Sequence, residues 1–104
     1  MVDYSEAVSQ GRSISFVYDG LDRVVTPTAH GLHASTGNET IRGFQTEGWT
    51  HSPGSPTPWR LFSVAKIVNP EYTGIVENQA PEGYEVGDSH ISPLFADFRD
   101  GVNA

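Results

Sequence analysis

Glycine and proline occur so often in this sequence that the chain has little room for a long helix. Eleven glycines and seven prolines are spread over 104 residues. Both residue types mark turns and disfavour the interior of a helix. The sequence therefore predicts one domain, built mainly from short strands and turns, that is long enough to bury a core without disulfides or metal.

An alternating pattern identifies the first expected strand and its partner. Residues 13–18 (SISFVY) carry a bulky apolar or aromatic side chain at every second position, as a half-buried strand does. Asp19-Gly20 then offers a turn, and residues 22–27 (DRVVTP) read as the partner strand. We expect Pro27 to prevent this strand from continuing as a central one, because proline has no N–H.

The other expected elements follow from caps, glycines and apolar runs. Asp3 and Glu6 have the form of a capping box, and Gly11 suits a helix end, so a short helix is expected over residues 4–10. Further along, we expect a hairpin over 31–44 with its turn at 36–38 and a strand over 40–46. A long loop is expected over 47–58, followed by a strand over 59–68 and a weak strand over 72–77. Near the end we expect a helical turn at about 93–98 that docks through Leu94, Phe95 and Phe98, and then a frayed tail beyond 99. This series predicts a mainly β fold, a small and strongly bent antiparallel barrel with a short N-terminal helix.

Two absences limit the class of protein. The chain has no cysteine, which excludes a disulfide framework and thiolate chemistry. It also has no long apolar stretch and no secretory leader pattern, so we expect no membrane span and a cytoplasmic location.

Charge is distributed unevenly along the chain. The formal net charge is −7, yet residues 23–66 hold four bases and two acids, between flanks rich in acids. The bases could form a cationic site or could be solvated strand ends and partners of the acidic flanks. The acids between residues 71 and 88, a stretch without a base, could face a basic protein or be solvated surface.

Several segments occur in an order that resembles WYL domains. They are ISFVY at 14–18, RVVTP at 23–27, TIRGFQ at 40–45, WRLF at 59–62 and KI at 66–67. The likeness covers roughly residues 5–88, including PEGY at 81–84, so residues 1–104 would form one WYL-like domain with a C-terminal docking segment and tail over 89–104. The resemblance implies an SH3-like or Sm-like barrel. WYL domains usually follow a helix-turn-helix domain in bacterial transcription regulators, where they are thought to sense nucleic acid or nucleotides, and others accompany bacterial and phage defence systems.

The sequence departs from the family pattern at two places. Glu39-Thr40-Ile41 stands where the Trp-Tyr-Leu triplet would be, and the usual closing arginine is Lys66, which keeps the charge but lacks the bidentate fork of arginine. Only about ten residues precede the first expected strand, so we expect no DNA-reading helix pair in this chain and no repressor activity by the chain alone.

The resemblance implies a cationic ligand site. The predicted ligand-binding residues are Arg23, Arg42, Gln45, Trp49, Arg60 and Lys66. Arg42 and Arg60 would contact phosphate with the other two bases in support, Gln45 would read a base edge, and Trp49 would stack on a base. In one continuous strand Arg60 and Lys66 would lie about 20 Å apart, so a small ligand need not touch both. Phe16, Tyr18 and Phe62 are assigned mainly to the core.

Signals for metal binding or catalysis are weak. His30 and His33 would face opposite sides of a strand, and no zinc spacing, nucleophile elbow or Walker loop occurs. We therefore expect no metal, no cofactor and no enzyme. The sequence predicts a non-catalytic regulatory module that binds an anionic ligand, a nucleotide or a short single-stranded nucleic acid. The alternative is an acidic protein-interaction module of a phage or bacterial regulator, which binds a basic partner or forms a homodimer through a sheet edge.

Overall fold

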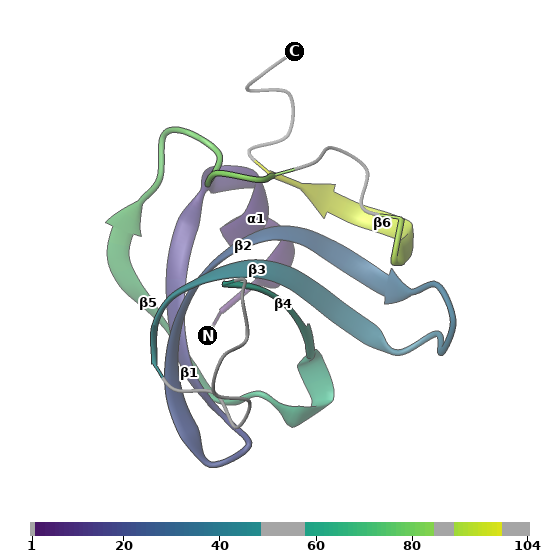
Figure 1. The fold of residues 1–104 in the computed structure, drawn as a ribbon, viewed down its shortest axis with the longest axis horizontal. Helices are drawn as coiled ribbons and strands as arrows, with labels where there is room; N and C mark the ends of the chain where they lie inside the picture. The colour runs from purple at the N-terminus through teal and green to yellow at the C-terminus, as the bar shows by residue number, and fades with distance from the viewer. Residues whose placement is uncertain (1, 49–57, 85–88, 99–104) are drawn as a thin grey trace.

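The chain forms a strongly bent antiparallel sheet with a short helix at its N-terminal end (Figure 1). The computed structural model describes residues 2–48, 58–84 and 89–98. Its elements are α1 (Tyr4–Gln10), β1 (Arg12–Tyr18), β2 (Leu21–His33), β3 (Glu39–Gly48), β4 (Trp59–Ser63), the 3₁₀ turn η1 (Val64–Lys66), β5 (Val68–Val76) and β6 (Ile91–Asp97). The strand order is β4-β3-β2-β1-β5, and β6 pairs with β2. The predicted mainly β, SH3-like class is confirmed, although the bent sheet is not closed, because no pairing joins β4 to β5 in the described residues.

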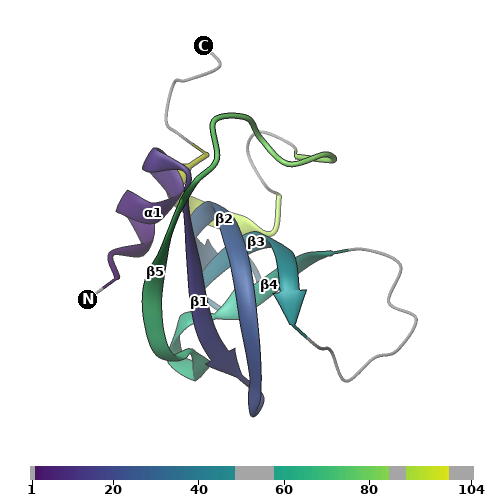
Figure 2. The same cartoon turned by 90° about the vertical axis from the view of Figure 1, so that its left-hand side faces the viewer.

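Helix α1 begins and ends where its caps predict. The side chain of Asp3 accepts a hydrogen bond from the backbone N–H of Glu6 at 3.0 Å, and Gly11 ends the helix with a φ of 69°. The backbone N–H of Asp3 donates to the hydroxyl of Tyr72 at 3.3 Å, so the cap also joins α1 to β5. Figure 2 shows α1 beside β1 and β5. No helix in the described part of the chain is long and apolar enough to cross a membrane.

The first hairpin forms as the sequence predicts. Asp19 and Gly20 have φ angles of 52° and 76°, the left-handed pair of a type I′ turn, and Tyr18 pairs with Leu21 across it. The second turn, at the end of β2, uses Gly37 with a φ of 75°. Both turns follow from local sequence alone.

The expected stop at Pro27 is wrong, because β2 continues through it as a central strand. On one side β2 pairs with β1 as far as Val25 and with β6 from Ala29 onward. Pro27 therefore lies between two successive partners, and on the β3 side a register shift follows directly after it. The missing N–H falls at an interruption of the sheet, where a proline is tolerated.

Two other expected elements are corrected by long-range strand pairing. The apolar run over 59–68 is divided into β4, η1 and the start of β5, because β4 and β5 are opposite edges of the sheet and η1 carries the chain between them. Residues 93–97 belong to β6 and Phe98 follows it directly, so this segment is not a helical turn. There Phe98 is buried as expected, whereas Phe95 is 51% exposed.

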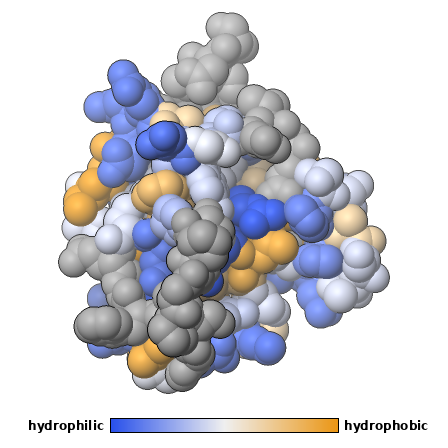
Figure 3. All heavy atoms as spheres, viewed as in Figure 1, coloured by the Kyte–Doolittle hydropathy of each residue, from blue (hydrophilic) through white to orange (hydrophobic). Residues whose placement is uncertain are grey.

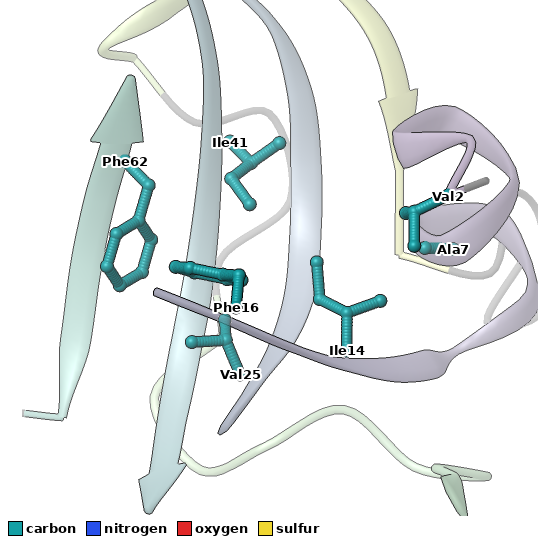
Figure 4. Packing of buried hydrophobic residues seen from close by; sticks show 7 residues of the cluster. All are labelled: Val2, Ala7, Ile14, Phe16, Val25, Ile41 and Phe62. Carbon is teal, nitrogen blue, oxygen red and sulfur yellow. The ribbon is translucent and has the colours of Figure 1, made fainter. Parts of the chain in front are cut away.

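The core lies on the concave face of the bent sheet, and its members come from β1, β2, β3, β4 and the N-terminal segment (Figure 4). The buried cluster consists of Val2, Ala7, Ile14, Phe16, Val25, Ile41 and Phe62. The ring of Phe62 meets Phe16 and Tyr18 edge-on, each at 5.0 Å between centroids. These aromatic contacts join β4 to β1 across the fold, and they confirm the assignment of the three rings to the core.

Strand β5 is an irregular edge of the sheet. Its pairing with β1 shifts register twice, and Asn69 and Gly74 have positive φ angles of 52° and 89°. Pro70 removes another backbone donor. The apolar side chains of Ile75 and Val76 are about half exposed here, at 52% and 49%. Figure 3 shows that apolar residues lie in separate small groups among polar ones on one face of the molecule.

Two tyrosines, Tyr4 in α1 and Tyr72 beside its N-terminal cap, predict a loss of stability at alkaline pH. Burial raises the pKa of Tyr4 and Tyr72, and the carboxylates of Glu39 and Glu6, respectively, raise it further. A group whose pKa is higher in the folded state contributes stability that is complete below its unfolded pKa, about 10 for tyrosine, and is lost as the pH rises through the folded value. We expect the free energy of unfolding in urea to fall above about pH 10. Tyr4→Phe, which loses no hydrogen bond to a described residue, should reduce that fall, and an unchanged pH profile in this variant would contradict the assignment.

Candidate anion-binding site

The sheet register brings Arg23 and Arg60 onto the same concave face. Arg23 lies opposite Phe16 in the pairing of β1 with β2, and Arg60 lies two residues before the buried Phe62 on β4. Side chains two residues apart share a face of a strand. Arg60 also pairs with Gly43, which has no side chain to occupy this face. Two arginines far apart in the sequence thus share one face at one end of the core.

Arg23 is held deep in the fold. The residue is only 5% exposed, and its guanidinium donates to the side-chain oxygen of Gln45 at 3.3 Å and to the backbone carbonyl of Tyr18 at 3.2 Å. Its carbon Cζ lies 5.5 Å from the ring centre of Tyr18 and 5.9 Å from that of Phe62. The Nε–H is buried and has no hydrogen-bond partner among the described residues. An unsatisfied buried donor of this kind is costly, and it points to an acceptor that the described residues do not supply.

Arg60 provides the second positive charge. It is half-buried, its Nε–H is also buried without a partner, and its guanidinium makes no hydrogen bond or ion pair with a described residue. Burial lowers the pKa of Arg23, and the charge of Arg60 lowers it further, while Asp19 has a smaller opposing effect. The two guanidinium charges therefore repel each other.

No described carboxylate lies within ion-pair distance of either arginine. Arg12, by contrast, is paired with Glu6 at 3.8 Å and lies over the ring of Tyr72. An anion with several oxygen atoms placed beside the two guanidinium groups would offset the repulsion between them. The arrangement is suited to binding an oxyanion.

The other predicted site residues are divided by the structure. Gln45 joins the arginines, because its carbonyl oxygen accepts from Arg23. Arg42 faces the opposite side of β3, where its guanidinium donates to Nδ1 of His90 at 3.0 Å. Lys66 is exposed at the end of η1, and Trp49 lies outside the described residues. The structure therefore gathers Arg23, Gln45 and Arg60, and it separates Arg42 from them.

Arg42 lines a pocket of about 160 Å³. Trp59, Tyr84 and His90 form part of its wall, and the indole N–H of Trp59 donates to the backbone carbonyl of Glu82 at 2.9 Å. The side chain of Trp59 is thus already held by the segment around Glu82. This pocket and the arginine pair lie on opposite faces of the sheet and cannot share one small ligand.

A broad hollow of about 930 Å³ lies against the β1–β2 hairpin and the start of β5. Its lining includes Arg23, but also the carboxylate residues Asp22 and Glu71. Asp22 faces the side of β2 opposite to Arg23, as alternation requires. The hollow is therefore less suited to an anion than the concave face.

Sequence reasoning missed a chain of polar contacts around the buried His30. Nδ1 of His30 is hydrogen-bonded to the hydroxyl of Ser5 at 2.7 Å, and Nε2 is 2.7 Å from a carboxylate oxygen of Glu39. The rings of Tyr4 and Phe95 pack against the imidazole. These contacts join α1, β2, β3 and β6, and no local spacing in the sequence signals them. No group of three or more metal-ligating side chains occurs in the described ranges.

The chain has no match among models of known families, among curated proteins or among solved structures. Its function is therefore inferred from the geometry and charge of the site.

Proposed function

We propose that this protein is a non-catalytic regulatory module that binds an anionic ligand, a nucleotide or a short single-stranded nucleic acid. The observation that carries the proposal is that Arg23 and Arg60 share one face of the sheet and that the buried Nε–H of each lacks an acceptor among the described residues. Buried donors in native proteins are nearly always hydrogen-bonded, so an unsatisfied one calls for an explanation. The guanidinium group of arginine matches the geometry of phosphate.

Gln45 adds donors of a different kind to the site. Its carbonyl oxygen is used by Arg23, which leaves the side-chain NH₂ group without a hydrogen bond to a described residue. That group can donate to a phosphate oxygen or to an acceptor on a base edge. The resemblance to WYL domains supports the same class of ligand, since their site is also cationic.

The binding proposal predicts a large effect of Arg60→Gln on nucleic-acid affinity. Loss of a hydrogen bond to a charged group costs about 1.5–3 kcal/mol, so we expect roughly tenfold to 100-fold weaker binding of a fluorescent single-stranded oligonucleotide. The plot of log K against log salt concentration should also become shallower by about 0.7, the contribution of one single-strand phosphate contact. Fluorescence anisotropy at several salt concentrations measures both quantities.

Arg12→Gln is the matched control for this experiment. It removes the same charge from the same residue type, but Arg12 lies at the other end of β1, beside Glu6 and Tyr72. We expect its affinity to remain within about threefold of wild type, because a distant surface charge contributes little at moderate salt. Equal losses of affinity in the two variants would mean that binding depends only on the overall charge of the protein. An absence of binding by the wild-type protein would contradict the proposal.

A protein-interaction module that pairs with itself through a sheet edge has less support from the geometry. The two register shifts, the positive φ angles and Pro70 all interrupt the regular backbone pattern of β5. An added strand needs an even row of donors and acceptors. Dimerisation of the protein in solution, together with failure of the oligonucleotide to bind, would support this alternative.

A further inference from the structure

The pocket that Arg42 lines is a second place where the fold can hold a ligand. It lies on the face of the sheet opposite the core, away from Arg23 and Arg60, and has a volume of about 160 Å³. Its described lining residues come from β2, β3, β4, residues 83–84 and residues 89–90. Five parts of the chain that are distant in sequence thus converge on one cavity.

Hydrogen bonds hold two walls of this cavity in place. On one side, the indole N–H of Trp59 donates to the backbone carbonyl of Glu82 at 2.9 Å. On the other side, the backbone N–H of Ala34 donates to the carbonyl of His90 at 2.8 Å. Because these walls are fixed before a ligand arrives, binding there requires little additional ordering of the chain.

Arg42 supplies a permanent positive charge to the cavity. It lies opposite Ala29 in the pairing of β2 with β3, so its neighbour across the strands is only a methyl group. Its guanidinium donates to Nδ1 of His90 at 3.0 Å, and a guanidinium has five N–H groups, so this bond does not exhaust it. Since Nδ1 of His90 accepts, the neutral imidazole carries its hydrogen on Nε2, which is a further donor.

The described residues that line the cavity include no aspartate or glutamate. Asp97 lies beyond Ala29 in the same row across the sheet as Arg42. Its carboxylate accepts hydrogen bonds from the hydroxyl of Tyr84 and from the backbone N–H of Phe98, and it does not line the cavity. The cavity therefore offers N–H donors and a positive charge, which suits a ligand with charged oxygen acceptors.

The volume of the cavity limits the size of that ligand. Pockets that enclose a drug-sized ligand measure about 300–1,000 Å³, so a cavity of about 160 Å³ cannot enclose the base, sugar and phosphate of a nucleotide. We infer that this cavity binds a small oxyanion, of the size of inorganic phosphate, sulfate or a short carboxylate, at a site separate from the arginine pair. The inference goes beyond the proposed function and does not depend on it.

Titration of inorganic phosphate, sulfate and acetate into ¹⁵N-labelled protein tests the inference, with chloride used to keep the ionic strength constant. We expect the amide signals of residues 28–29, 83–84 and 89–90 to shift along a saturable curve for at least one of these anions, with a Kd of about 1 mM or lower. Arg42→Gln should weaken this binding about tenfold or more, because it removes a charged donor. Arg12→Gln should leave the Kd within about threefold of wild type, because its charge is distant.

The possible outcomes separate this site from the arginine pair. The absence of a saturable shift for every probe, or equal weakening by the two variants, would overturn the inference. Shifts centred on Arg23 and Gln45 would place the anion at the arginine pair and overturn it as well. Adenosine monophosphate is the control for size: tenfold tighter binding than phosphate at the same signals would contradict a small ligand.

The titrations and the oligonucleotide experiment are independent of each other. Loss of oligonucleotide binding in Arg60→Gln concerns the arginine pair alone, so either proposal can fail while the other stands. Thermal unfolding of each variant shows whether it is folded. The titrations of the wild-type protein need no variant, so a variant that fails to fold does not leave the inference untested.

Discussion

Replacing Phe62 with alanine should lower the free energy of unfolding by about 3–5 kcal/mol. Phe62 is 1% exposed and belongs to the central cluster of the core. Its ring meets Phe16 and Tyr18 edge-on at 5.0 Å, so the substitution removes apolar burial and two aromatic contacts at once. A domain of this size is stable by only about 5–15 kcal/mol, so the loss would bring the protein close to unfolding at moderate temperature.

Urea unfolding followed by circular dichroism measures this loss, and Phe95→Ala is its control. Phe95 is the same residue type, but it is 51% exposed and its ring meets only His30 edge-on at 5.3 Å among the described ring contacts. Its removal should cost no more than about 1.5 kcal/mol. If the two alanine variants lost equal stability, the core would not be organised around Phe62 as the structure has it.

Gly31→Ala should detach β6 from the sheet or cost about 2–3 kcal/mol through overpacking. A methyl group at residue 31 would collide with the backbone carbonyl oxygen of Pro93 and would lie 2.5 Å from Cγ2 of Ile91. Both obstacles belong to β6, and one of them is backbone, which cannot rotate away. The close approach of β2 and β6 therefore depends on a residue without a side chain.

Amide hydrogen exchange identifies where this damage occurs. We expect the amides of β6 to lose protection while those of β1 keep theirs, because β1 pairs with β2 before Pro27 and β6 pairs after it. Gly37→Ala is the comparison: it adds the same methyl group in open space, where only the φ of 75° causes strain of about 1–2 kcal/mol. Full protection of β6 in Gly31→Ala would show that the strands do not approach so closely.

The parts of the fold that the sequence predicts correctly are those with local causes. The caps of α1 and the left-handed turn at Asp19-Gly20 are specified by neighbouring residues, and they form as expected. The alternation of β1 is likewise visible in its own residues. The stability of each of these features depends on a few adjacent residues.

The errors arise where a distant strand decides the local structure. Pro27 is acceptable in β2 only because two different partners meet there, and neither partner is visible from the residues around it. The apolar run over 59–68 is broken because its two halves pair with β3 and β1 at opposite edges. Residues 93–98 have helical apolar spacing, but the backbone of β2 offers them hydrogen-bond partners that an isolated helical turn lacks.

The candidate site was predictable in part. Arg42 follows Ile41, so once Ile41 is assigned to the core, alternation alone places Arg42 on the other face. The placement of Arg23 and Arg60 on one face depends instead on the strand order β4-β3-β2-β1, which brings together strands that are far apart in the sequence. Sequence reasoning therefore named the arginines, and the strand order decides which of them share a face of the sheet.

The irregular backbone of β5 has a consequence for the protein at high concentration. Another chain that approached this strand would find its hydrogen-bonding row broken at Asn69, Pro70 and Gly74. Fibre growth requires each added chain to form backbone hydrogen bonds along an uninterrupted edge strand. The half-exposed isoleucine and valine of this strand can thus remain in contact with water without seeding stacked sheets from it.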